Sequence, residues 1–175
     1  MTIIAALIAA LVAVTGYMVT QAQARRERRA NEFADALAAV EEYLEAPYRI
    51  RRRQSATAEG RDALANTLSD LQARIARHRS WLRVEAPPVA EAYDALVAAA
   101  RSEAGVQMTE AWNSAPPASD ADMNLWVAYQ HPNSDAERDK VIAIMRQNLR
   151  YVPSIRWLRR KRNAVTGSIS AAIRP

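Results

Sequence analysis

The first twenty residues are almost entirely apolar and include no charged side chain. In the run of seventeen residues from Ile3 to Val19, every residue is apolar except one threonine and one glycine. As a helix this run rises about 25 Å, and extension to Ala22 gives about 30 Å, the hydrocarbon thickness of a bilayer. The segment Arg25–Arg29 then brings four arginines within five residues. This pattern predicts a transmembrane anchor over residues 1–24.

The position of the arginines predicts how such an anchor is oriented. Because basic residues stay on the cytoplasmic side, the N-terminus is expected outside the cell membrane and the rest of the chain in the cytoplasm. An alternative is a cleaved signal peptide, since Ala22-Gln23-Ala24 matches a signal-peptidase site. The protein would then be secreted. Against cleavage, no basic residue precedes the apolar run. Alanines that recur every fourth residue also allow a homodimer through this helix.

Beyond the arginines, apolar residues recur with helical spacing. Phe33, Leu37, Val40 and Leu44 lie four, three and four residues apart, and Pro47 ends or kinks this helix. A second stripe keeps a 4-3-4-3-4 spacing over nearly three heptads, typical of a coiled-coil seam. Its members are Leu64, Leu68, Leu71, Ile75, His78 and Leu82. We expect His78 to be a core residue of this helix.

Prolines divide the remainder into further helices. Pro88 suits the first turn of a helix that reaches Asn113, and a short helix is expected after Ser119. Ser134 and Glu137 fit a capping box at the start of a last helix, which Pro153 ends. The predicted fold is all-α: a transmembrane helix followed by an antiparallel bundle of three long helices and one short helix.

Charge is unevenly distributed along the chain. Residues 1–84 carry a net charge of +4, residues 85–145 carry −7, and residues 146–175 carry +8. Twenty-two arginines against two lysines, with 37 alanines, indicate a high-G+C genome of a bacterium or phage. Part of the arginine content therefore reflects composition. The expected domains are an anchor (1–24), a cytoplasmic bundle (25–153) and a basic, partly disordered tail (154–175).

Residue patterns of common enzymes and metal sites do not occur in the sequence. Glycine-rich phosphate loops, the G-x-S-x-G elbow and H-E-x-x-H are missing, and the chain has no cysteine. The two histidines, His78 and His131, lie 53 residues apart. We therefore expect no enzyme activity, no cofactor and no metal site. Nucleic-acid binding is disfavoured because no recognition module is recognisable.

Two groups of basic residues are candidate contact sites. In an antiparallel bundle the last helix returns toward the anchor, so the tail is expected to meet the anionic inner leaflet together with the first arginines. The predicted membrane-contact residues are Tyr17, Arg25, Arg26, Arg28, Arg29, Arg156, Trp157, Arg159, Arg160, Lys161 and Arg162. The second group lies at the far end of the bundle, as a candidate site for a protein partner or an anion. It comprises Tyr48, Arg49, Arg51, Arg52 and Arg53.

These observations give a function hypothesis and two alternatives. The first is a single-pass membrane-anchored helical protein with an interaction or scaffold role and an unknown protein partner. One alternative is a membrane-tethered binding protein for an anionic ligand or partner through Arg49–Arg53. The other is a secreted helical protein, should residues 1–24 be removed.

Overall fold

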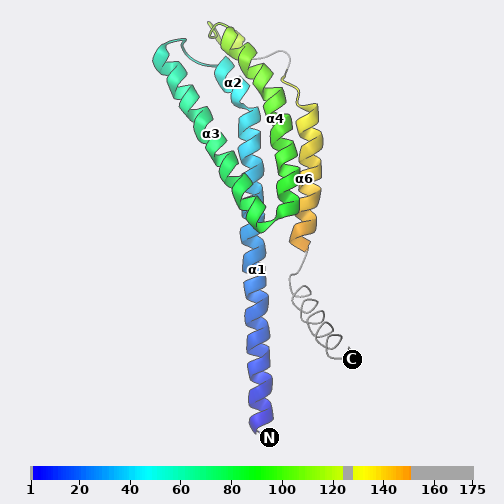
Figure 1. Cartoon of the computed structure of the whole chain (residues 1–175). Helices are drawn as coiled ribbons and strands as arrows, with labels where there is room; N and C mark the ends of the chain where they lie inside the picture. The colour runs from blue at the N-terminus through cyan, green and yellow to red at the C-terminus, as the bar shows by residue number, and fades with distance from the viewer. Residues whose placement is uncertain (1, 124–127, 151–175) are drawn as a thin grey trace, which may run out of the picture. The chain divides into compact units, whose positions relative to one another are not determined.

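The computed structural model describes residues 2–123 and 128–150, with side chains from Ala10 onward except that of Asp120. All elements in this part of the chain are helices (Figure 1): α1 (Thr2–Leu44), α2 (Ala46–Arg51), α3 (Ala58–Glu85), α4 (Pro87–Asn113), α5 (Asp120–Met123) and α6 (Pro132–Arg150). The all-α prediction is confirmed. The sequence predicted an N-terminal helix followed by three long helices and one short helix; the described residues form the long α1, α3, α4 and α6 and two short helices, α2 and α5.

The expectation of a transmembrane anchor over residues 1–24 is not supported. In the part of the chain whose side chains are described, no helix is both long enough and apolar enough to cross a bilayer. Helix α1 runs through Ala24 and Arg25 without a break, so the apolar residues and the first arginines belong to one helix.

Residues 28–148 form a compact unit of their own. Within it, α1 and α4 run in one direction and α3 and α6 in the other, so consecutive long helices are antiparallel (Figure 1). From α1, the stripe of Phe33, Val40 and Leu44 is buried in the core. The edge of the Phe33 ring packs against Trp81 of α3, with the ring centres 6.1 Å apart.

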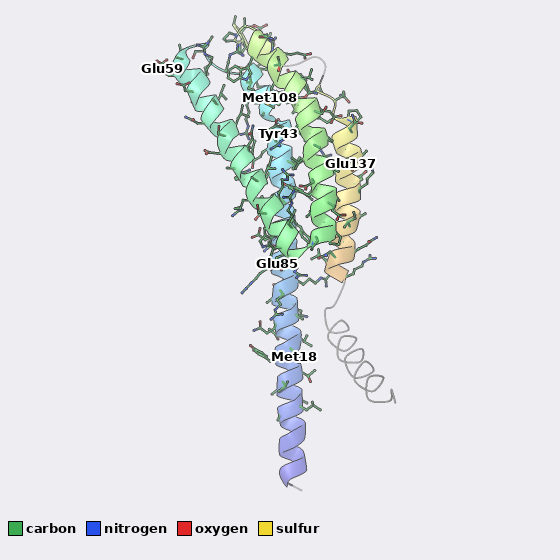
Figure 2. All side chains as sticks on the ribbon, viewed as in Figure 1. Met18, Tyr43, Glu59, Glu85, Met108 and Glu137 are labelled. Atoms are coloured by element: carbon green, nitrogen blue, oxygen red, sulfur yellow. The ribbon has the colours of Figure 1, made fainter. Side chains whose placement is uncertain are left out.

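The turn between α3 and α4 is very short, because Ala86 is both the C-cap of α3 and the N-cap of α4. Figure 2 labels Glu85 beside this turn and Glu59 at the opposite end of α3. Two ion pairs join the helices near the turn: Asp94 accepts from Arg79 at 2.6 Å and from Arg83 at 2.9 Å. These hydrogen bonds outweigh partial burial and hold the pKa of Asp94 below its usual value.

The buried hydroxyl of Tyr93 fixes α4 against α1. It donates to the backbone carbonyl of Ala36 at 3.0 Å. Burial raises the pKa of Tyr93 far above its usual value, so the phenol remains a donor. A buried phenol needs such a partner, because an unpaired polar group in the core costs about 1–3 kcal/mol.

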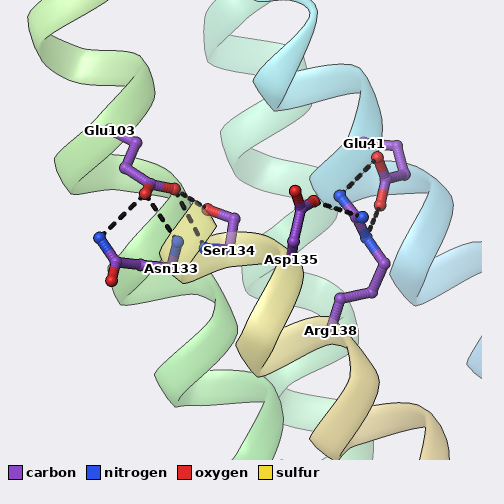
Figure 3. A network of polar contacts seen from close by, with 6 residues as sticks. All are labelled: Glu41, Glu103, Asn133, Ser134, Asp135 and Arg138. Carbon is purple, nitrogen blue, oxygen red and sulfur yellow. Dashed lines mark hydrogen bonds and ion pairs between the residues drawn. The ribbon is translucent and has the colours of Figure 1, made fainter. Parts of the chain in front are cut away.

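Helix α6 is held to the bundle by a carboxylate at its start (Figure 3). Glu103 of α4 accepts from the backbone amides of Asn133 and Ser134, at 2.9 and 3.0 Å, and from the Ser134 hydroxyl at 2.5 Å. The first amides of a helix lack partners within it, so a carboxylate there is stabilising. The expected capping box at Ser134 is therefore replaced by a cap from another helix.

One arginine joins α6 to α1 (Figure 3). The Arg138 guanidinium lies 2.5 Å from Glu41 and 2.6 Å from Asp135. Val141 and Met145 supply the buried apolar side chains of α6. The helix begins at Pro132, three residues before the start that a cap at Ser134 predicts, because proline fits a first turn where its missing N–H has no partner to lose.

Candidate interaction surface at the α2 corner

The predicted arginine site lies where α2 turns the chain from α1 into α3. Pro47 sits in the first turn of α2, and Ala46, Pro47 and Ile50 are buried. These small and apolar residues pack α2 against the bundle, and the arginines lie in the last turn of α2 and directly after it. Arg49 and Arg51 belong to the last turn, where positive charge is favourable beside the helix carbonyls.

Arg53 is the one residue of the predicted site that the fold buries, with 8% of its surface exposed. Its guanidinium donates to the carbonyls of Ile50 at 3.0 Å and Ala111 at 2.8 Å, and also to those of Trp112 and Ser114. It lies 5.6 Å from the centre of the Trp112 ring. These carbonyls end α2 and α4 and carry the negative end of each helix dipole. Arg53 therefore caps two helices through its two Nη groups, whereas its buried Nε has no hydrogen-bond partner among the described residues.

Tyr48 and Arg52 contact the segment around α5. The backbone amide of Tyr129 donates to the Tyr48 hydroxyl at 2.8 Å, and the two rings meet edge to face, 4.7 Å apart. Arg52 donates from Nε to the carbonyl of Met123 at 3.1 Å and places its charge 5.4 Å from the Tyr48 ring centre. Burial raises the pKa of Tyr129 above its usual value. These two predicted site residues thus position a neighbouring segment.

Two shallow hollows lie beside this corner and along the first half of α3, and we call them together the groove at the α2 corner. Its first part is lined by Arg49, Arg52, Arg53, Gln54, Ser55, Gly60 and Leu64. Its second part is lined by Arg61, Asp62, Ala65, Leu68, Ser69, Gln72 and Trp112. Gly60 leaves little room for a side chain, because a Cβ there would lie 3.0 Å from Ser55 Oγ. The half-buried Leu64 and Leu68 form its apolar floor, and exposed charged residues form its rim: Arg49, Arg52, Arg61 and Asp62.

The sequence did not reveal this groove, because all six seam residues of α3 were expected in the core. Leu71, Ile75, His78 and Leu82 are buried as predicted, whereas Leu64 and Leu68 are half-buried. Trp112 of α4 also lines the groove. A signal was present: between residues 58 and 70, Leu64 and Leu68 are the only large apolar residues.

The predicted membrane-contact residues fall into two sets. Tyr17, Arg25, Arg26 and Arg28 are exposed on α1, and Arg29 pairs with Glu85 at 3.3 Å. The tail set lies outside the described residues and remains a prediction. It consists of Arg156, Trp157, Arg159, Arg160, Lys161 and Arg162.

His78 is a core residue, and the described residues include no metal site around it. No group of three or more His, Cys, Asp or Glu side chains is placed there to hold a metal ion. His78 Nδ1 lies 3.7 Å from a Glu32 carboxylate oxygen. Burial, assisted by the charge of Arg77, lowers the pKa of His78 below its usual value. The imidazole is therefore neutral at pH 7.

Comparisons of the chain with protein-family models, curated proteins and solved structures find no match. A function must therefore be argued from the residues themselves. The features that ask for an explanation are the exposed apolar residues of α1 and the basic groove at the α2 corner.

Proposed function

We propose that the protein is a helical interaction module held at a membrane by the N-terminal end of α1. One observation carries this proposal: large apolar side chains of α1 are left in contact with solvent. Leu11, Val12, Val14, Tyr17, Met18 and Val19 are between 52% and 68% exposed. Figure 2 labels Met18 among them.

The arrangement of these side chains favours lipid as their environment. At 100° per residue they spread around most of the helix circumference, and the intervening positions are mainly Ala and Gly. A helix that is apolar all round is typical of a membrane or a large protein core. The hydroxyls of Thr15 and Thr20 donate to the helix carbonyls of Leu11 and Gly16. Neither hydroxyl therefore needs water, as burial in lipid requires.

The flanking charges support a defined orientation. No charged side chain precedes Arg25, and four arginines follow at once. Each basic residue near an anionic leaflet contributes about 1 kcal/mol of attraction. We propose that the arginines, and the bundle that follows them, lie on the cytoplasmic side.

The proposal is tested by fractionation of cells that produce the full chain. We expect the protein in the membrane pellet after washes with high salt and with alkaline carbonate, which remove proteins bound by charge alone. Val12→Asp should move it into the supernatant, because an acid within lipid costs about 2.5–3.5 kcal/mol. Val106→Asp is the matched control, since Val12 and Val106 are 66% and 62% exposed and the second belongs to the bundle.

Three results would contradict parts of the proposal. Release of the wild-type chain by salt would show that charge, and not apolar burial, holds it. Equal release of both aspartate variants would mean that a general loss of structure causes the effect. A mature N-terminus at Arg25, found by mass spectrometry, would establish the secreted alternative.

A further inference from the structure

We propose that the groove at the α2 corner binds an acidic amphipathic helix of a partner protein. This inference rests on the proposed role as an interaction module and names the class of partner. It is carried by two independent properties of the groove: a half-buried continuation of the α3 seam, and a lining with more arginines than acidic residues.

The floor of the groove continues the buried seam of α3. Leu64 and Leu68 keep the 4-3 spacing that places Leu71 and Ile75 in the core, so they lie on the same face of the helix. In Figure 1, α3 diverges from α1 and α4 toward its start. Leu64 and Leu68 are thus half-buried and line the groove, the second together with Trp112. A seam of this spacing is completed by another helix that packs apolar residues three and four apart.

The rim of the groove selects the charge of that helix. Arg49, Arg52 and Arg61 line it, and Asp62 is the one acidic residue among the lining. Arg53 also lines it, but this residue is buried and its Nη groups donate to carbonyls at the ends of α2 and α4. A helix with glutamates beside its apolar stripe therefore complements the groove, whereas a basic helix is repelled.

The charge of the chain itself argues against its own tail as the occupant. Residues 151–175 carry six arginines and lysines and no acidic residue. Such a segment is repelled by the three rim arginines. The charge of the groove thus favours a segment of a partner protein as its occupant.

The test uses the full chain in nanodiscs of phosphatidylcholine, with empty discs as the blank. The probe is a labelled synthetic helix of three heptads, with leucine at the first and fourth positions of each heptad and glutamate at the flanking positions. Fluorescence anisotropy measures its binding. One control peptide has the same composition with scattered leucines, and the other has lysine for glutamate. We expect the acidic amphipathic peptide to bind at least about tenfold more tightly than either control.

Two matched variants locate the binding on the protein. Leu68→Glu places an acid in the floor and should weaken binding by about tenfold or more. Ala76→Glu adds the same charge at an exposed position of the same helix and should leave binding within about twofold. Circular dichroism of both variants checks that the bundle still folds.

Several outcomes would overturn the proposal. It fails if the acidic peptide does not bind, if Leu68→Glu binds like the wild type, or if the lysine peptide binds equally well. Displacement of the peptide by inorganic pyrophosphate in proportion to site occupancy would assign the arginines to an anionic ligand. Concentration-dependent dimers that Leu68→Glu abolishes would assign the groove to a second copy. In each case membrane retention of the same chain is unaffected, so failure here is distinct from failure of the proposed function.

Discussion

Helix α1 carries large apolar side chains in two stretches that meet different surroundings. Leu11 is 68% exposed, whereas Phe33, Val40 and Leu44 are at most 4% exposed. The residue types are alike, but the patterns differ. In the second stretch the spacing leaves a polar face with Glu41 and Glu42, so one stripe can be covered by other helices. The first stretch has no polar face, so no one side of the helix is preferred for packing against a bundle.

The largest expected effect tests this contrast with one substitution made in both stretches. Leu44→Ala should lower the free energy of unfolding of the bundle by about 2–5 kcal/mol, because it removes buried methyl groups and leaves a cavity. Leu11→Ala should leave that free energy unchanged. Urea titration of the full chain in mild detergent, followed by circular dichroism, measures both. Equal losses would mean that the first stretch also packs in the bundle.

The seam of α3 shows how far such patterns reach. Its spacing correctly predicted the burial of Leu71, Ile75 and Leu82, and the prolines correctly predicted the breaks near α2 and α4. The pattern could not show that Leu64 and Leu68 are only half-buried. The spacing of apolar residues is a property of one helix, whereas the burial of their side chains depends on the helices packed against it. The same limit applies to Glu103, whose contacts with Ser134 join residues far apart in the sequence.

The candidate arginine site was predicted as a cluster, but its parts differ for a physical reason. Arg53 and Arg49 are equivalent in the sequence, four residues apart in an arginine-rich run. In the fold, Arg53 lies against the end of α4, some sixty positions away, where carbonyls without partners bind its guanidinium. Local pattern identifies charge, and only the tertiary contact distinguishes a helix cap from a surface charge.

That distinction gives the second prediction. Arg53→Met should cost about 2–4 kcal/mol of bundle stability, since it leaves buried carbonyls of α2 and α4 without donors. Arg49→Met, at an exposed position of the same run, should change stability by less than about 0.5 kcal/mol. Urea titration in detergent compares the two variants. Similar costs would refute the capping role of Arg53.

A third, smaller effect concerns the attachment of α6. Burial raises the pKa of Glu103, but hydrogen bonds from Ser134 and Asn133 lower it more, so the net pKa lies below its usual value. A carboxyl with a lowered folded pKa stabilises the fold above its unfolded pKa, near 4.3, and loses that contribution as pH falls through the folded value. We expect hydrogen exchange at the start of α6 to speed up in acid before exchange in α4 does.

Glu103→Gln tests the same cap at neutral pH. The amide keeps an acceptor oxygen but loses the charge that favours the start of a helix, so we expect a cost of about 1 kcal/mol. Hydrogen exchange in α6 should then be fast at pH 7 and nearly independent of acid. Glu110→Gln, at an exposed site of α4, should behave like the wild type.

The smallest expected effect comes from His78, between α3 and α1. Burial first, and then Arg77, lower its pKa; Glu32 and Asp35 on α1 raise it, and Arg74 lowers it further. The net shift is downward, so the unfolded chain binds a proton at about pH 6.5 while the folded imidazole stays neutral. Stability is therefore complete above about pH 6.5 and falls as pH drops below it, by at most about 1.4 kcal/mol per pH unit.

Substitution of His78 isolates this slope from the carboxylates, which titrate in more acidic solution. Urea titrations between about pH 7 and pH 5 should show a decline in the free energy of unfolding for the wild-type chain. His78→Leu should flatten that decline, because the seam position then holds an apolar residue without a proton to bind. His131→Gln, which changes the other histidine, should keep the decline. A slope that survives in His78→Leu would mean that other titratable groups, and not the buried imidazole of α3, set the pH dependence of stability in this range.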